Sequence, residues 1–222
     1  MPMPRILIIN PNTSESVTQR VVSACRQAQP GAHWEAATAR FGAPYIASEA
    51  TYAVGAHAVL DAWEAFVAAS GRPDAVLVAC FGDPGVLALR EVAQVPVVGL
   101  AQASFEAAAA RGPFAVVTGG IAWGPMLQRF ARMHQLDTRL CAIHTVELTG
   151  AQIAEAPALA MDMLAEACRR AIEDGAQYLL LGGAALAGMA AQLQPRVPVP
   201  LLDNVLLGAA AAAGAAQPGG AR

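Results

Sequence analysis

Short apolar runs alternate with segments of helical periodicity along the chain. Six runs are apolar on both faces, and strands are expected at residues 5–10, 74–80, 95–100, 113–119, 176–183 and 197–203. Helices are expected at residues 14–28, 48–70, 84–93, 102–111, 124–135, 157–174 and 204–216. This alternation predicts an α/β fold with mainly parallel sheets and right-handed crossovers.

The pattern repeats once. "DAVLVACFG" at 74–82 matches "AQYLLLGGA" at 176–184, and "PVVGLAQASFEAAAA" at 96–110 matches "PVPLLDNVLLGAAAA" at 198–212. The offset of 102 to 103 residues predicts two pseudo-symmetric lobes, each with a small parallel sheet flanked by helices, facing each other across an active-site cleft. We expect residues 1–100 plus 205–222 to form the first lobe, with the C-terminal helix returning to it and a disordered tail after about 214, and residues 101–204 to form the second.

Composition narrows the choice of function. The chain is 55% hydrophobic and 14% charged, with a formal charge of −3. It has no stripe of basic residues that could hold phosphate groups, so nucleic acid is not expected as a partner. No apolar window reaches the roughly 18 to 20 residues of a membrane span, and the first residues lack the features of a signal peptide, so a cytoplasmic location is expected. The four cysteines and four histidines lack the spacings of a disulfide framework or a metal site, and no nucleotide-binding fingerprint occurs.

Ligands of open α/β sheets bind at the carboxyl ends of the strands, where four loops of this chain are expected. These are Asn10–Ser14, Cys80–Gly85, Thr118–Gly120 and Gly182–Ala184. In the first, Thr13 or Ser14 suits a helix N-cap, and the turn either binds an anion or is simply a capped turn. Thr118 and the glycines after it offer a hydroxyl and backbone donors, or form an ordinary tight turn.

Cys80 differs from the other cysteines because it lies where a strand meets the start of a helix near Pro84. Such a position lowers a thiol pKa toward neutrality, so Cys80 is a candidate acid/base or nucleophile. The alternative is a buried apolar cysteine, the reading favoured for Cys25, Cys168 and, less strongly, Cys141. A pairing of Cys80 with His57 or His144 stays open, since such partners are neighbours in space rather than in sequence.

Several segments resemble the aspartate/glutamate/hydantoin racemase superfamily, and hydantoin and allantoin racemases most closely. They are "INPNTS", "FGAPYIAS", "ACFGDPGVLALREVAQVPVVGLAQAS", "VVTGG" and "VPLLDNV". The resemblance implies cofactor-free chemistry in which two cysteines flank a carbon acid, and it gives Cys80 the role of one acid/base. It also implies that the substrate is bound by residues of the four loops, namely Asn10, Thr13, Ser14, Phe81, Gly82, Thr118, Gly119, Gly182 and Ala184.

The second cysteine of this pattern is missing. Where the resemblance leads one to expect a cysteine in the second lobe, this chain has Gly183, and its last cysteine, Cys168, lies in a predicted helix. A bound water or His144 is then the first suspect for the second face. We expect a racemase or isomerase that moves a proton alpha to the carbonyl or carboxylate of a small amino-acid derivative, such as a 5-substituted hydantoin. The alternatives are a single-cysteine decarboxylase, a cis-trans isomerase or a non-catalytic binder of such carboxylates or cyclic amides, and a homo-oligomer is left open.

Overall fold

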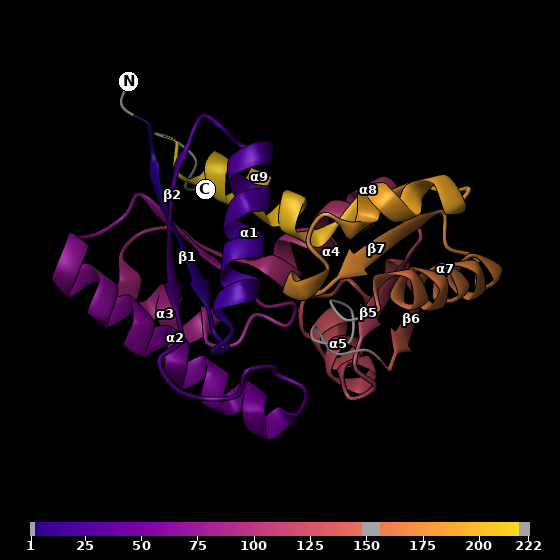
Figure 1. The fold of residues 1–222 in the computed structure, drawn as a ribbon, viewed down its shortest axis with the longest axis horizontal. Helices are drawn as coiled ribbons and strands as arrows, with labels where there is room; N and C mark the ends of the chain where they lie inside the picture. The colour runs from indigo at the N-terminus through magenta and orange to yellow at the C-terminus, as the bar shows by residue number, and fades with distance from the viewer. Residues whose placement is uncertain (1–2, 148–155, 218–222) are drawn as a thin grey trace.

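The computed structural model describes residues 3–147 and 156–217. The described chain contains two parallel four-stranded sheets with helices packed around them, as predicted (Figure 1). The first sheet has the order β2-β1-β3-β4, with β1 Arg5–Asn10, β2 His33–Thr38, β3 Ala75–Val78 and β4 Val97–Gly99. The second has the order β6-β5-β7-β8, with β5 Phe114–Gly119, β6 Leu140–Val146, β7 Tyr178–Gly182 and β8 Leu201–Asp203.

Seven of the described helices lie close to their predicted ranges. They are α1 Glu15–Ala28, α2 Glu49–Ser70, α3 Val86–Ala93, α4 Leu100–Arg111, α5 Trp123–Met133, α7 Pro157–Glu173 and α9 Asn204–Ala215. The five-residue helix α8 Met189–Leu193 was not predicted. Short 3-10 turns, which the periodicity did not predict, are η1 Asp137–Arg139, η2 Ala184–Leu186 and η3 Gln194–Arg196. The serines before α1 and α2 cap them, since Ser14 accepts from Val17 N, and Ser48 forms a capping box with Thr51.

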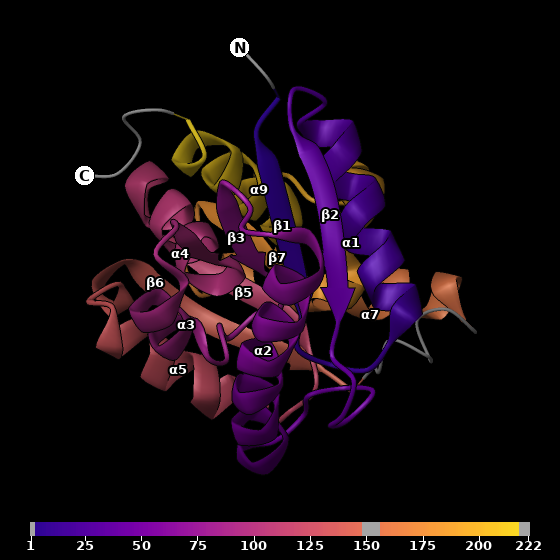
Figure 2. The ribbon, with the colours of Figure 1, turned by 90° about the vertical axis from the view of Figure 1, so that its left-hand side faces the viewer.

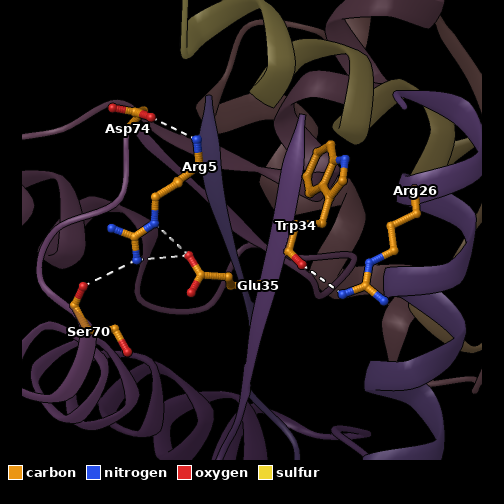
Figure 3. Close-up of polar contacts among 6 residues, drawn as sticks. All are labelled: Arg5, Arg26, Trp34, Glu35, Ser70 and Asp74. Carbon is orange, nitrogen blue, oxygen red and sulfur yellow. Dashed lines mark hydrogen bonds and ion pairs between the residues drawn. The ribbon is translucent and has the colours of Figure 1, made fainter. Parts of the chain in front are cut away.

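The sequence prediction missed β2 and β6, which are the outer strands of their sheets. Each has one face partly open to solvent and therefore lacks the continuous apolar run of the inner strands. Polar contacts hold β2 instead (Figure 3). Arg5 Nε of β1 donates to Glu35 Oε2 over 3.0 Å, and Arg26 of α1 donates to Trp34 O over 3.0 Å.

The two lobes repeat each other in detail. Val78 pairs with Ile9 in the first sheet as Leu181 pairs with Val117 in the second, so Asn10 corresponds to Thr118 and Cys80 to Gly183. Each lobe also has a left-handed glycine immediately before a short helix: Gly85 with φ +77 before α3, and Gly188 with φ +80 before α8. The separation of these glycines matches the offset seen in the sequence.

The last helix leaves the second sheet and packs on the first. Figures 1 and 2 show α9, in yellow, beside α1 and α4. Its buried residues Val205, Ala209 and Ala212 join the core that contains Ile6 and Leu77. The division at residue 100 stays a prediction. Helix α9 continues to Ala215, slightly beyond the predicted start of the disordered tail, and residues 218–222 of that tail lie outside the described residues.

The close approach of α4 and α9 can be tested with two glycines of α9. A Cβ at Gly208 would meet Leu100 Cδ1 at 2.6 Å, whereas one at Gly214 has no atom within 4 Å. We expect Gly208→Ala to lower the free energy of unfolding by about 1 kcal/mol or more through overpacking, and the control Gly214→Ala to raise it slightly through helix propensity. Denaturant unfolding of both variants measures this. Equal effects of the two substitutions would contradict the packing described.

Candidate active site

A cleft that opens to solvent lies between the carboxyl ends of the two sheets. It is lined by Asn12, Val17, Tyr45, Ile46, Ala79, Cys80, Phe81, Thr118, Gly119, Trp123, Gly182, Gly183, Ala184, Ala185 and Leu186. Loops far apart in sequence and from both lobes therefore meet at one place, as the repeat predicted.

Seven of the site residues expected from the sequence line this cleft: Cys80, Phe81, Thr118, Gly119, Gly182, Gly183 and Ala184. Gly82 lines a neighbouring hollow, and Asn10, Thr13 and Ser14 lie outside the lining. The sequence reasoning missed eight lining residues. Asn12 and Val17 lie in and just after the first loop, Tyr45 and Ile46 in the loop before α2, and Trp123 at the start of α5. The other three, Ala79, Ala185 and Leu186, lie next to positions that the sequence had named. Tyr45 and Ile46 belong to the quoted segment "FGAPYIAS", which was the available signal.

The residues of the first loop that lie outside the lining build the turn that presents Asn12. The buried Asn10 side chain donates to Asn12 Oδ1 over 3.0 Å and to Thr18 Oγ1 over 2.9 Å. Ser14 N also donates to Asn12 Oδ1, over 2.9 Å, and Thr13 N is bonded to Ala43 O over 3.1 Å. Asn12 lines the cleft with its amide oxygen held by two donors, which fixes the orientation of its side chain.

Contact between Phe81 and Gly182 brings the two lobes together at the cleft. A Cβ at Gly182 would overlap the Phe81 ring, so only glycine permits this packing. The ring also lies 5.7 Å from that of Phe105 in an apolar core that contains residues of both lobes. Because Cys80 precedes Phe81 and Gly183 follows Gly182, this contact sets how the two corresponding positions face each other.

Cys80 lies in a tight turn just after β3. Its carbonyl accepts from Gly82 N at 2.9 Å and from Asp83 N at 3.1 Å, and the residue is only 7% exposed. Burial, and then the charge of Asp83, raise the pKa of the Cys80 thiol well above its ordinary value. The predicted lowering of this pKa is wrong for the unliganded protein, because α3 begins only at Val86 and the turn before it adds a carboxylate.

Gly183 adopts a backbone conformation that differs from that of an ordinary L-residue, with φ +120 and ψ 127. An added Cβ would lie 3.7 Å from Thr118 Oγ1 and 3.8 Å from Leu186, so there is space for it, but not without backbone strain of about 1–3 kcal/mol. Arg20 of α1 donates to Ala185 O over 2.9 Å and holds the following turn from the other lobe. A Gly183→Cys side chain therefore fits the second face only at the cost of this strain or of a rearranged turn.

The segment before α2 that carries Tyr45 and Ile46 is hydrogen-bonded to the other lobe beside the cleft. Tyr45 Oη donates to Gly119 O over 3.1 Å, and Trp123 Nε1 donates to Ile46 O over 3.0 Å, so two hydrogen bonds join the lobes here. Burial, and then the charge of Cys80, raise the pKa of Tyr45. The Tyr45 phenol therefore stays protonated in the cleft.

The histidines considered as partners of Cys80 lie elsewhere. His144 Nε2 is 2.7 Å from Asp174 Oδ2 at the end of α7, and His57 packs edge-on against Phe41 with ring centroids 5.2 Å apart. Neither lines the cleft. Over residues 3–147 and 156–217, no cluster of His, Cys, Asp and Glu side chains could hold a metal ion, and no helix is long and apolar enough to cross a membrane.

Known proteins share both the sequence and this arrangement. The family model described as Asp/Glu/Hydantoin racemase matches residues 6–212. The chain belongs to the Asp/Glu/hydantoin racemase family. It is 31% identical to the hydantoin racemase of Paenarthrobacter aurescens over 204 residues, which cover 90% of this chain and 86% of that protein.

Solved structures agree with this membership. The allantoin racemase of Klebsiella pneumoniae superposes with a TM-score of 0.85 at 32% identity, covering 93% of this chain and 85% of that one. An arylmalonate decarboxylase variant with one glycine changed to cysteine and one cysteine to serine superposes with a TM-score of 0.71 at 16% identity, covering 97% and 94%. The likeness to the decarboxylase concerns the fold alone. This enzyme belongs to the racemase family, although Gly183 occupies the position in the second lobe that corresponds to Cys80.

The raised pKa of Cys80 makes a prediction about thiol reactivity. At pH 7 we expect iodoacetamide to label the exposed Cys141 faster than Cys80, because Cys80 is buried and held as the unreactive thiol. Mass spectrometry of peptides after timed labelling gives a rate for each cysteine, and the buried Cys25 and Cys168 serve as internal references. Faster labelling of Cys80 would mean that its thiolate is stabilised after all.

Proposed function

We propose that this racemase acts without a cofactor on the carbon alpha to a carbonyl of a small cyclic amide, such as a 5-substituted hydantoin, with Cys80 as the acid/base. The observation that carries the proposal is a cleft with a lone thiol on one lobe and, on the other, the Thr118 hydroxyl and the backbone of Gly182 and Gly183. The names of the relatives, a hydantoin racemase and an allantoin racemase, support the same class of substrate.

The charge of the cleft favours a neutral substrate. None of the described side chains that line it carries a formal charge, so an amino-acid dicarboxylate lacks the cationic partner that usually binds such groups. A cyclic amide needs no counter-charge. Its carbonyl and N–H groups can pair with hydroxyl and amide groups such as those of Thr118 and Asn12, while the apolar side chains surround its substituent.

The proposed reaction is a proton transfer. Cys80 first gives its thiol proton to solvent, and the thiolate then takes the proton from the substrate carbon. The C–H electrons move into the adjacent carbonyl, and a hydrogen-bond donor such as Thr118 stabilises the enolate oxygen. Return of the proton from the Cys80 thiol to the same face restores the original configuration. Inversion needs a proton on the other face, where Gly183 offers no side chain, and we propose that solvent supplies it.

One thiol in the cleft predicts asymmetric exchange. In D2O we expect one hydantoin enantiomer to exchange its alpha proton with retained configuration at least several-fold faster than it racemises, while its mirror image exchanges no faster than it racemises. Proton NMR combined with chiral chromatography measures both rates. Two-base chemistry instead couples exchange to inversion.

The control for this experiment is Cys80→Ala, which should lose exchange and racemisation to the level of buffer alone, a drop of about 100-fold or more. Its far-UV circular dichroism should match that of the unaltered protein. An active alanine variant, or equal exchange and racemisation of both enantiomers by the unaltered protein, would contradict the one-thiol mechanism.

A second candidate, single-face decarboxylation, is favoured by the protonated state of Cys80. Loss of CO2 from a substituted malonate leaves an enolate that needs one proton, which the Cys80 thiol can give before it recovers one from solvent. We rank this reaction second because its malonate substrate is a dicarboxylate, and no charged side chain of the lining can pair with it. We expect no CO2 release from arylmalonates. Rapid release with a single product enantiomer, lost in Cys80→Ala, would reverse the ranking.

The remaining expectations belong to this proposal. The substrate is a small molecule, no cofactor takes part, and the enzyme works in the cytoplasm. Nucleic acid is not a partner, because the 14 basic residues are outnumbered by 17 acidic ones. A screen of hydantoins, allantoin, aspartate, glutamate, maleate and arylmalonates, followed by chiral analysis, separates the racemase from a cis-trans isomerase and from a non-catalytic binder.

A further inference from the structure

The buried carboxylate of Asp83 joins the turn that carries Cys80 to helix α4. Asp83 Oδ1 accepts from Ala101 N and Oδ2 from Gln102 N, each over 2.7 Å. Both N–H groups belong to the first turn of the helix, where no intrahelical acceptor exists. Asp83 N in turn donates to Cys80 O. A continuous set of hydrogen bonds therefore runs from the helix through Asp83 to the thiol-bearing residue.

The chain around Asp83 is shaped for this carboxylate. Asp83 itself has φ +58, a left-handed conformation that is costly for a residue with a side chain and persists where the surroundings fix it. Gly99, immediately before α4, leaves room for the Asp83 carboxyl group, because a Cβ at position 99 would overlap it. Gly99 has φ −89 and ψ 134, so an alanine fits its backbone conformation, and the carboxylate alone excludes it.

The second lobe has a matching anchor, in which the carboxylate comes from the end of the fourth strand instead of the loop after the third. Asp203, at the end of β8, accepts from Val205 N at 2.9 Å and Leu206 N at 3.3 Å in the first turn of α9. It also accepts from Gly188 N at 2.8 Å, just before α8. In each lobe one buried carboxylate thus ties the loop after the third sheet strand to the helix after the fourth.

We propose that Asp83 is the positioning residue for Cys80: by fixing the turn between β3 and α3 to helix α4, it holds the thiol at the substrate carbon. The inference rests on the proposed function insofar as Cys80 is the working thiol. Asp83 does not line the cleft and so acts through Cys80 rather than on the substrate.

The ionisation of Asp83 is shaped by the groups around it. Burial raises the pKa of Asp83 to about 7. The two backbone donors and Arg90 of α3 lower this pKa, and Glu106 of α4 raises it. Tyr52 of α2 also faces the group, and burial followed by the charge of Asp83 raises its pKa to about 12. Cys80 titrates above the pKa of Asp83, so Asp83 is ionised when the thiol loses its proton.

The test begins with Asp83→Asn, which keeps the shape of the side chain and removes its charge. The Nδ2 group of asparagine cannot accept from a helix N–H, so one of the two hydrogen bonds to α4 is lost. We therefore expect kcat for hydantoin racemisation or exchange to fall at least about tenfold with KM changed less than about twofold, because the thiol is misplaced while the binding groups remain. We also expect the pH midpoint of Cys80 alkylation to fall by about one pH unit, since a neighbouring negative charge has been removed.

Two further variants separate position from charge and from stability. Gly99→Ala displaces the carboxylate sterically without removing it, and should lower kcat in the same way as Asp83→Asn. Asp203→Asn makes the same chemical change at the matching anchor. It should lower the melting temperature as Asp83→Asn does but leave the alkylation midpoint of Cys80 in place, because Asp203 acts on the pKa of Cys25 instead.

The outcomes are distinguishable. If Asp83→Asn and Asp203→Asn destabilise the protein equally and neither changes kcat or the Cys80 midpoint, Asp83 is only a helix cap and the proposal fails. If Asp83→Asn does not fold, Gly99→Ala decides through kcat. If the unaltered protein racemises no hydantoin, the proposed function fails, while the alkylation midpoints still decide whether Asp83 controls Cys80.

Discussion

The contact of the Phe81 ring with the bare backbone of Gly182 is the constraint on which the arrangement of the site depends. It joins the carboxyl ends of β3 and β7 in an apolar core that contains residues of both lobes. The residues beside this contact, Cys80 and Gly183, occupy corresponding positions in the two lobes, so the packing of one aromatic ring sets the spacing of the two faces of the cleft. A side chain at position 182 would overlap the Phe81 ring, so this packing could not form as it stands.

Burial at this contact has a cost for the chemistry. The same apolar packing that fixes the turn removes the Cys80 thiol from water and disfavours its thiolate, and Asp83 adds a negative charge nearby. An uncharged cleft offers no cation to offset this. Burial and the charge of Asp83 therefore both favour the protonated form of the Cys80 thiol.

Duplication explains why the two halves of the cleft are alike in backbone and unlike in chemistry. Sheet order, the left-handed glycines before α3 and α8 and the buried carboxylate anchors recur in both lobes. The position that carries the Cys80 thiol in the first lobe carries Gly183 in the second, in a backbone conformation reserved for glycine. The second lobe thus keeps the framework of the site but has adapted its turn to a residue without a side chain.

The sequence by itself determined the α/β fold and the two-lobe repeat, because inner strands of parallel sheets are continuously apolar and the repeat is visible as a constant offset. It also predicted that Cys80 would lie at the end of an inner strand, where the structure places it in the cleft. It did not reveal β2 and β6, whose exposed faces give no such run. Nor did it reveal Tyr45 and Trp123 as cleft residues, since their partners Gly119 and Ile46 lie in the other lobe. The raised pKa of Cys80 was decided only by the tertiary structure: a thiol's ionisation depends on its burial and on nearby charges, and these exist only once the turn is packed between the lobes.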